Sequence, residues 1–73
     1  MTAREMFFKL GYTECQDNLF AITYYKFDGQ NCASINFFKS GKVFDADENL
    51  TSKDVTMEEL KAINQQCKEL RWI

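Results

Sequence analysis

Two turn dipeptides, Asp28-Gly29 and Ser40-Gly41, constrain the fold of this chain more than any other feature. An Asp-Gly pair between apolar runs is typical of a β-hairpin, because the favoured tight turn needs positive φ angles that these residues adopt readily. The flanking segments LFAITYYKF (19–27) and NCASINFF (31–38) are rich in aromatic and β-branched residues, as strands are. The sequence therefore predicts an antiparallel pair of strands joined at the first turn.

The register of this pair follows from the length of the turn. A two-residue turn makes one face apolar, through the pairs Tyr24–Ala33, Ile22–Ile35 and Phe20–Phe37. The other face is then mostly polar, with the pairs Tyr25–Cys32, Thr23–Ser34 and Ala21–Asn36. A four-residue turn shifts every pair by two residues and keeps the same two faces, so the length of the loop stays open.

The second turn adds a third strand, which we expect from residue 42 to residue 46. If Lys39 pairs with Lys42, Phe44 lies opposite Phe37 and Ala46 continues the same face. The apolar face then extends across all three strands, so two independent turns agree on one core. Residues 12–18 and 47–55 are expected to form loops.

A capping box begins each of two expected helices. Thr2 and Glu5 open the first, expected over residues 3–10 and closed by Gly11, and Thr56 and Glu59 open the second. The second helix carries an apolar stripe at three- and four-residue steps, made by Met57, Leu60, Ile63, Cys67 and Leu70. Because the apolar sheet face must be covered, both helices are expected to pack on it. The prediction is a single α+β domain over residues 1–73, in the order α-β-β-β-α, with a three-stranded antiparallel meander.

Composition argues against most catalytic and cofactor chemistry. The chain has no histidine, three widely spaced cysteines and three isolated glycines. It therefore offers no histidine base, no CxxC zinc pair and no glycine-rich phosphate loop. Asp45, Asp47 and Asn49 have the spacing of calcium ligands, but Leu50 stands where such a loop needs glycine. We expect a protein that is not an enzyme and that needs no metal or cofactor.

The charge balance argues against direct binding to nucleic acid. The net charge is −2, the isoelectric point is about 5.0, and the basic residues form no run. The N-terminus lacks the pattern of a secretory signal, and no apolar run reaches membrane-spanning length. Together with the odd number of cysteines, these features predict a cytoplasmic protein with reduced thiols and no membrane contact.

Several aromatic side chains are predicted on the sheet face that points away from the core. Exposed aromatics near one another often mark a partner surface, and an acidic cluster beside them would steer the partner. The predicted partner-binding residues are Tyr25, Phe38, Phe27, Asp45, Asp47 and Glu48. Four alternatives stay open: loops that cover the aromatics, a nucleic-acid-related regulator, an acidic surface that mimics nucleic acid, and a self-associating structural protein that forms a homodimer through a sheet edge.

Both ends of the chain resemble a group of short proteins from phages and prophages of Gram-positive bacteria. TAREMFFKLGY (2–12) is similar to their opening, and TMEELKAINQQCKELRW (56–72) is similar to their closing segment, with the strand-rich middle unmatched. Arg71 stands where the group's pattern has glycine, which leaves the end of the second helix open. The resemblance implies a small accessory protein inside a bacterial host cell. Such a protein would bind a host or phage protein, and inhibitors of host defence, including anti-CRISPR proteins, are examples.

Overall fold

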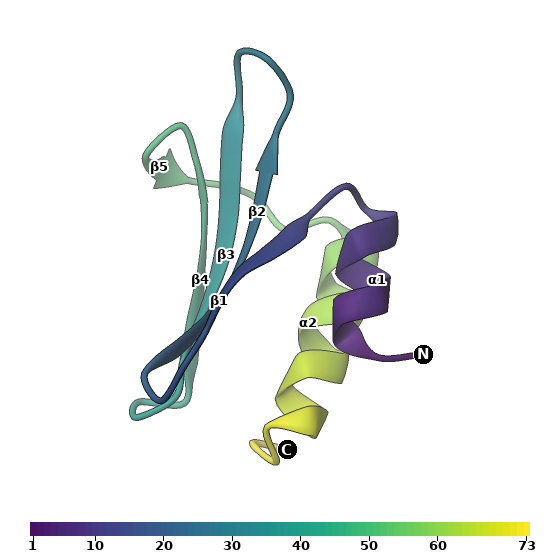
Figure 1. Cartoon of the computed structure of the whole chain (residues 1–73), viewed down its shortest axis with the longest axis vertical. Helices are drawn as coiled ribbons and strands as arrows, with labels where there is room; N and C mark the ends of the chain where they lie inside the picture. Colours follow the sequence, from purple (N-terminus) through teal and green to yellow (C-terminus); the bar gives the residue numbers. More distant parts are fainter.

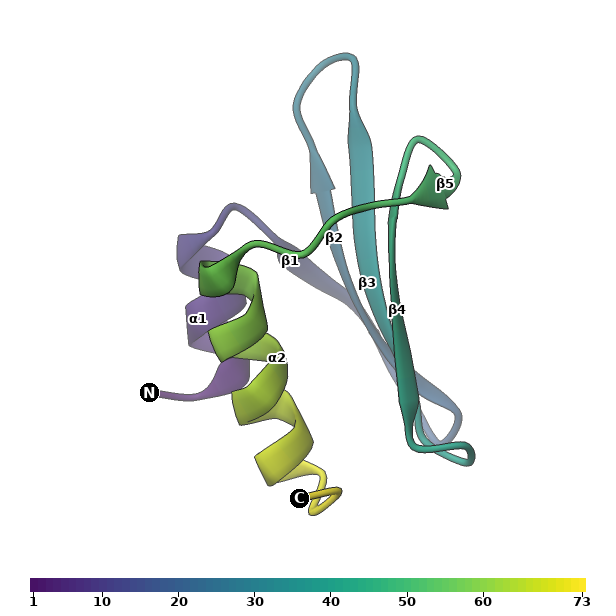
Figure 2. The same cartoon turned by 180° about the vertical axis from the view of Figure 1, so that it is seen from behind.

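The computed structural model describes all residues from 1 to 73 and contains two helices and five strands. The elements are α1 (Ala3–Lys9), β1 (Thr13–Asp17), β2 (Ala21–Phe27), β3 (Cys32–Phe38), β4 (Val43–Glu48), β5 (Thr51–Ser52) and α2 (Met57–Glu69). The strands form one antiparallel sheet in the order β1-β2-β3-β4-β5. Both helices lie together on one face of the sheet, and the other face is open (Figures 1 and 2). The predicted α+β class is confirmed.

The prediction of three strands is wrong, because the sheet has five. β1 lies within residues 12–18 and β5 within residues 47–55, both expected to be loops. The sequence of β1, TECQD, carries no apolar alternation, and most of its side chains are exposed. This edge strand depends on backbone pairing with β2, and it contains a bulge at Cys15. Pairing of this kind leaves no hydrophobic pattern for sequence reasoning to find.

The loop between β2 and β3 has four residues, so the pairs expected from a two-residue turn are wrong. Tyr24 lies opposite Ile35 and Ile22 lies opposite Phe37, which is the register of the four-residue alternative. Asp28 closes the loop, because its backbone amide donates to the Asn31 carbonyl and its side chain accepts from the Asn31 amide. The two faces are as predicted, except at position 20.

Phe20 does not join the core face. It lies in the turn between β1 and β2, where its side chain is 76% exposed. The second hairpin is confirmed, since Phe44 lies opposite Phe37 and Ala46 lies opposite Ile35. β4 continues to Glu48, two residues beyond the expected end of that strand.

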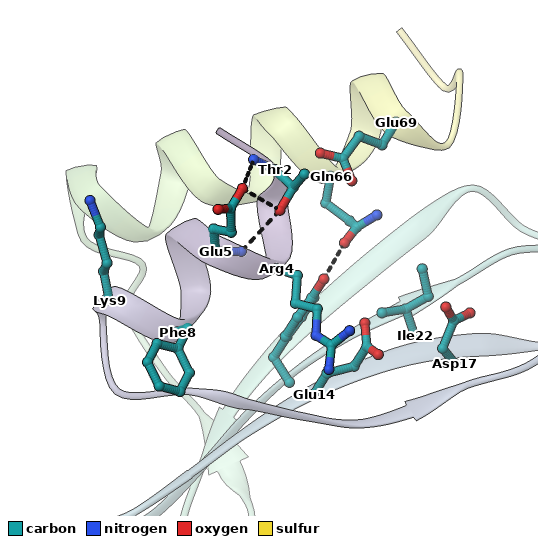
Figure 3. Close-up of a pocket in the computed structure, with 11 residues that line it drawn as sticks. Thr2, Arg4, Glu5, Phe8, Lys9, Glu14, Asp17, Ile22, Gln66 and Glu69 are labelled. Carbon is teal, nitrogen blue, oxygen red and sulfur yellow. Dashed lines mark hydrogen bonds between the residues drawn. The ribbon is translucent and has the colours of Figure 1, made fainter.

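Both capping boxes are confirmed. Figure 3 shows the first as dashed lines, in which Thr2 accepts from the Glu5 amide and Glu5 accepts from the Thr2 amide. The second box, from Thr56 and Glu59, has the same two bonds. α1 ends at Lys9, one residue before the expected end, and Gly11 follows in the left-handed region at φ +94°.

The two helices end in the same way. After α1, the Tyr12 amide donates to the Phe7 carbonyl, and after α2 the Trp72 amide donates to the Cys67 carbonyl. Each bond spans a residue with positive φ, as in a Schellman motif. That residue is Gly11 after α1 but Arg71, at φ +62°, after α2. Arg71 therefore holds a conformation that costs a residue with a Cβ atom about 1–2 kcal/mol.

Replacing Arg71 by glycine is expected to raise the free energy of unfolding by about 1 kcal/mol. Glycine adopts the left-handed conformation without the Cβ clash, and this gain exceeds its extra entropy in the unfolded chain. Urea denaturation followed by circular dichroism would measure the difference. Lys68→Gly, inside the last turn of the same helix, serves as the control and should lose about 1 kcal/mol. A loss of stability in both variants would contradict this account of the helix end.

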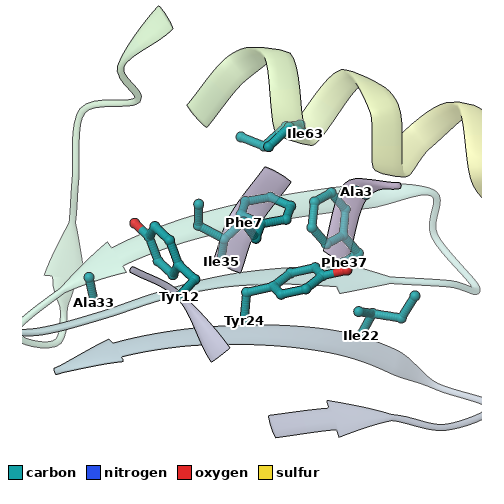
Figure 4. Close-up of a cluster of buried hydrophobic side chains, with 10 residues drawn as sticks. Ala3, Phe7, Tyr12, Ile22, Tyr24, Ala33, Ile35, Phe37 and Ile63 are labelled. Carbon is teal, nitrogen blue, oxygen red and sulfur yellow. The ribbon is translucent and has the colours of Figure 1, made fainter. Parts of the chain in front are cut away.

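The core lies between the sheet and the two helices, and Phe7 stands at its centre (Figure 4). The Phe7 ring stacks on Tyr24 with centroids 4.1 Å apart and meets the edges of Tyr12 and Phe37. Ten buried residues form this cluster: Ala3, Phe7, Tyr12, Ile22, Tyr24, Ala33, Ile35, Phe37, Ala62 and Ile63. Both ends of the chain thus contribute side chains to one core.

The stripe predicted for α2 is only partly correct. Ile63, Cys67 and Leu70 face the core, but Met57 and Leu60 are 66% and 44% exposed. The space on the core side is taken instead by Ala62 and by two buried polar residues, Glu59 and Gln66. These two residues are needed because the tyrosines of the core bury hydroxyl groups that require hydrogen-bond partners.

Candidate functional site

The outer face of the sheet carries the three aromatic residues predicted for partner binding. Tyr25, Phe27 and Phe38 are 39%, 59% and 40% exposed, so neighbouring segments do not cover them. Tyr25 lies opposite Ser34, and Phe38 is four residues further along β3. The strand rises about 3.3 Å per residue, so Tyr25 and Phe38 are separated by about 13 Å along the sheet. They therefore belong to opposite ends of the face and do not form one patch.

A polar ladder crosses the middle of the outer face. The Thr23 hydroxyl on β2 donates to Asn36 Oδ1 on β3 at 2.8 Å, and Asn36 Nδ2 donates to Asp45 Oδ1 on β4 at 2.9 Å. Asp45 is thus engaged by a side chain of its own sheet. The ladder separates an apolar end around Phe38 and Val43 from another around Tyr25.

We call the second apolar end the tip patch, which consists of Tyr25, Phe27, Cys32 and Leu50. Phe27 pairs directly with Cys32 at the end of the β2–β3 hairpin. A shallow hollow of about 490 Å³ lies beside them, and Tyr25, Cys32, Asp47 and Leu50 contribute to its lining. Leu50 is the most exposed residue of the patch, with its side chain 100% accessible. An apolar patch with a polar rim is typical of a protein-binding surface.

Asn49 fixes the turn that presents Leu50. Its backbone amide donates to the Cys32 carbonyl at 2.7 Å, and its Oδ1 accepts from the Cys32 amide at 3.0 Å. Its Nδ2 donates to Asn31 Oδ1 at 3.0 Å. Asn49 and Leu50 both have positive φ, at +53° and +67°, and leucine rarely adopts this conformation. Two hydrogen bonds to Cys32 of β3 and one to Asn31 in the β2–β3 loop therefore hold the turn, which keeps a strained leucine in solvent.

Tyr25 keeps its proton over the whole physiological range. The neighbouring Cys32 side chain raises the pKa of the Tyr25 hydroxyl, and slight desolvation and the nearby Cys15 raise it further. The neutral hydroxyl at the centre of the tip patch can both donate and accept a hydrogen bond. This is the combination of an apolar ring and a polar end that makes tyrosine common in binding surfaces.

The predicted acidic cluster does not form one surface. Asp47 lies on the outer face beside the tip patch, and Asp45 belongs to the polar ladder. Glu48 lies on the opposite side of the sheet, where it lines a small cavity together with Tyr12 and Lys53. Successive side chains of β4 alternate between faces, so Glu48 points away from Asp45 and Asp47, which share the outer face. Of the six predicted residues, the fold brings together Tyr25, Phe27 and Asp47.

Sequence reasoning missed Leu50, Asn49 and Cys32 as members of this site. In the sequence, Leu50 stood out only because it occupies the position at which a calcium-binding loop needs glycine. The one available signal was Asn49, because asparagine favours turns and tolerates positive φ. No sequence pattern indicates that the next residue, a leucine, shares that conformation.

The side chains form no metal-binding cluster, and the cysteines are unpaired. No group of three or more Cys, Asp and Glu residues is arranged to hold a metal ion. Cys15, Cys32 and Cys67 form no disulfide, and burial raises the pKa of the Cys67 thiol. Every fully buried side-chain nitrogen and oxygen has a hydrogen-bond partner. Neither helix is long and apolar enough to cross a membrane.

Comparison with known proteins gives no relative. No protein-family model, no curated protein and no solved structure matches this chain.

Proposed function

We propose that this chain is a non-enzymatic protein-binding module that uses the tip patch as its anchor surface. The observation that carries the proposal is Leu50, a fully exposed leucine in a strained turn that Asn49 holds in place. Local strain of this kind concentrates at functional sites, and a leucine in water contributes nothing to folding. With Tyr25 and Cys32 lining the same hollow, Leu50 supplies an exposed apolar side chain of the kind on which binding energy concentrates. Asp47 at the rim would guide a partner with a basic surface.

The cellular context that we propose is a phage or prophage accessory protein in the cytoplasm of a bacterial host. The two end segments that resemble such proteins support it, and they are also the segments that build the helices. In this proposal the tip patch binds a host protein, and an inhibitor of host defence is one role that fits. The sheet is the part of the chain that the resemblance leaves unmatched, and the binding surface lies there.

Removal of the tip patch is expected to abolish most partner binding. Tyr25→Ala/Leu50→Ala should weaken binding at least about tenfold, because each true anchor contributes more than about 1 kcal/mol. The control is Phe38→Ala/Val43→Ala, which removes an aromatic and an aliphatic side chain, 40% and 54% exposed, from the other end of the same face. A pull-down from a Gram-positive lysate would identify the partner, and calorimetry with that purified partner would measure the affinities.

The Phe38→Ala/Val43→Ala variant distinguishes the tip patch from the other apolar end of the outer face as the binding site. Loss of binding in the Phe38→Ala/Val43→Ala variant alone would overturn the tip patch as the anchor. A dimer in sedimentation of the pure wild-type protein that dissociates in the Tyr25→Ala/Leu50→Ala variant would assign the patch to self-association. Competition between the captured partner and an oligonucleotide would favour nucleic-acid mimicry. Circular dichroism must first show that both double variants remain folded.

A further inference from the structure

Two turns at one end of the sheet carry a second group of exposed apolar side chains. The β1–β2 turn (residues 18–20) and the β3–β4 turn (residues 39–42) lie side by side at the end opposite the tip patch (Figures 1 and 2). The Lys39 amide joins the two turns by donating to the Phe20 carbonyl at 2.9 Å. We call the apolar group at this end the end patch, which consists of Leu19, Phe20, Phe38 and Val43.

Asn18 holds the first two of these side chains in solvent. Its Oδ1 accepts from the Phe20 amide at 2.8 Å and from the Ala21 amide at 3.0 Å, and its own amide donates to the Ala21 carbonyl at 3.0 Å. Leu19 and Phe20 therefore project from a stiff turn, and they are 87% and 76% exposed. No hollow of the molecule is lined by a residue of the end patch. The end patch is thus a projection, and it has no pocket for a partner's side chain.

Basic residues surround the end patch. The end of α2 lies at the same end of the long axis as the two turns (Figures 1 and 2), and together these segments bring four cations: Lys39, Lys42, Lys68 and Arg71. Asp17 and Glu69 offset part of this charge, Asp17 through an ion pair with Lys39 at 3.2 Å. The turns at the other end of the sheet, residues 28–31 and 47–52, contain acidic residues and no lysine or arginine. The net charge of −2 therefore conceals an end that is locally positive.

We propose that the end patch docks the protein on the surface of an anionic phospholipid membrane. Leu19 and Phe20 enter the boundary between headgroups and acyl chains, and Lys39 and Lys42 contact the phosphates beside them. A second copy fits this end poorly, because a symmetric contact brings the lysines of the two molecules together. A protein partner fits it less well than a lipid surface, because separate projections without a hollow between them match a broad, deformable surface.

Surface docking is compatible with the rest of the chain. No membrane contact was expected from the sequence, because no apolar run reaches membrane-spanning length, but binding at the bilayer surface needs no such run. The cytoplasmic leaflet of a cell membrane is negatively charged, as the basic residues of this end require. The tip patch lies at the opposite end of the sheet, so a docked molecule keeps it free for a protein partner. The proposal does not depend on the function proposed for the tip patch.

Co-sedimentation with vesicles of phosphatidylglycerol and phosphatidylcholine tests the proposal. Leu19→Ala/Phe20→Ala should bind at least about tenfold more weakly than the wild type, because two large apolar side chains no longer enter the lipid. The matched control, Tyr25→Ala/Leu50→Ala, removes one aromatic residue and one leucine from the tip patch, and it should bind vesicles like the wild type. Circular dichroism must show that both variants remain folded.

Two further measurements test the charge and the orientation. Lys39→Gln/Lys42→Gln should bind the vesicles several-fold more weakly, whereas Lys9→Gln/Lys61→Gln, which changes the net charge equally on the helices, should not. In ¹⁵N NMR with vesicles that carry a nitroxide-labelled lipid, the amides of residues 18–20 and 39–43 should broaden, and those of residues 28–31 should not.

Several results would overturn membrane docking. They are no binding of the wild type, equal binding to vesicles of phosphatidylcholine alone, equal weakening in both apolar double variants, or broadening at residues 28–31. A protein that the wild type captures from a lysate and Leu19→Ala/Phe20→Ala loses, without vesicle binding, would assign the end patch to a protein partner instead. Each of these results leaves the test of the tip patch unaffected, because that test measures a different partner with different variants.

Discussion

Replacing Glu59 by alanine is expected to lower the free energy of unfolding by about 4 kcal/mol. Glu59 is 5% exposed, and its two carboxylate oxygens accept hydrogen bonds from Lys53 Nζ at 2.5 Å and from the Tyr12 hydroxyl at 2.6 Å. The variant leaves the ammonium group of Lys53, whose side chain is 10% exposed, without a counter-charge. It also removes the acceptor of a buried hydroxyl and one bond of the capping box. Urea denaturation followed by circular dichroism would measure the loss.

Two comparisons isolate the cause. Glu58→Ala, at the neighbouring exposed position of the same helical turn, should change stability by less than about 0.5 kcal/mol. The double variant Lys53→Met/Glu59→Leu should recover much of the loss, because removing both charges leaves neither one buried alone. If Glu59→Ala loses less than about 1 kcal/mol, the buried network does not hold α2 on the sheet.

Glu59 also makes stability depend on pH. Burial alone would raise its pKa, but hydrogen bonds from Lys53, Tyr12 and the Thr56 amide, with the charge of Lys53, outweigh burial and hold the pKa at about 2. The ordinary value in the unfolded chain is 4.5, so the unfolded chain takes up the proton first as the pH falls. The stabilisation that ionised Glu59 gives the folded state is complete above about pH 5 and is lost between about pH 4.5 and pH 2. Each unit of difference between its pKa in the folded and unfolded chain corresponds to about 1.4 kcal/mol. Glu59→Ala should lack this acid-dependent loss.

The parts of the fold that were predictable are those that local signals specify. The capping boxes at Thr2 and Thr56 and the register of the hairpin around Ser40-Gly41 each depend on a few adjacent residues, and all three are confirmed. β1 and β5 could not be found, because they are held by backbone pairing at a sheet edge and bury almost no side chain. The four-residue loop after β2 was undecidable, because both loop lengths give the same two faces.

The candidate site was predictable only where alternation along a strand decides exposure. This rule correctly predicted that Tyr25, Phe27 and Phe38 are exposed. It could not show that a polar ladder separates Phe38 from Tyr25 and Phe27. The largest hollow of the molecule is lined in part by Glu14 and Asp17, which lie in the unpredicted strand β1. A search for apolar periodicity could not predict that Glu59 and Gln66 are buried, because these polar residues are buried as hydrogen-bond partners of tyrosine hydroxyls. Tertiary hydrogen bonding, which no local pattern records, determined these positions.

Replacing Phe7 by alanine is expected to lower the free energy of unfolding by about 4 kcal/mol. The Phe7 side chain is fully buried and contacts three aromatic rings, so the variant leaves a cavity that the rigid rings around it cannot fill. A domain of this length has a total stability of only about 4–11 kcal/mol. The variant should therefore retain only about 0–7 kcal/mol, and a large fall in the midpoint of thermal denaturation relative to the wild type would show the loss.

Phe8 provides the matched control for Phe7, because the same change is made one residue further along the same helix. Phe8 is 72% exposed, and Phe8→Ala should change stability by less than about 0.5 kcal/mol. Both variants alter helix propensity in the same direction, so the difference between them measures burial alone. Phe7→Leu, which refills much of the space, should lose clearly less than Phe7→Ala. Equal losses in Phe7→Ala and Phe8→Ala would contradict the packing of α1 against Tyr24 and Phe37, on which the whole core depends.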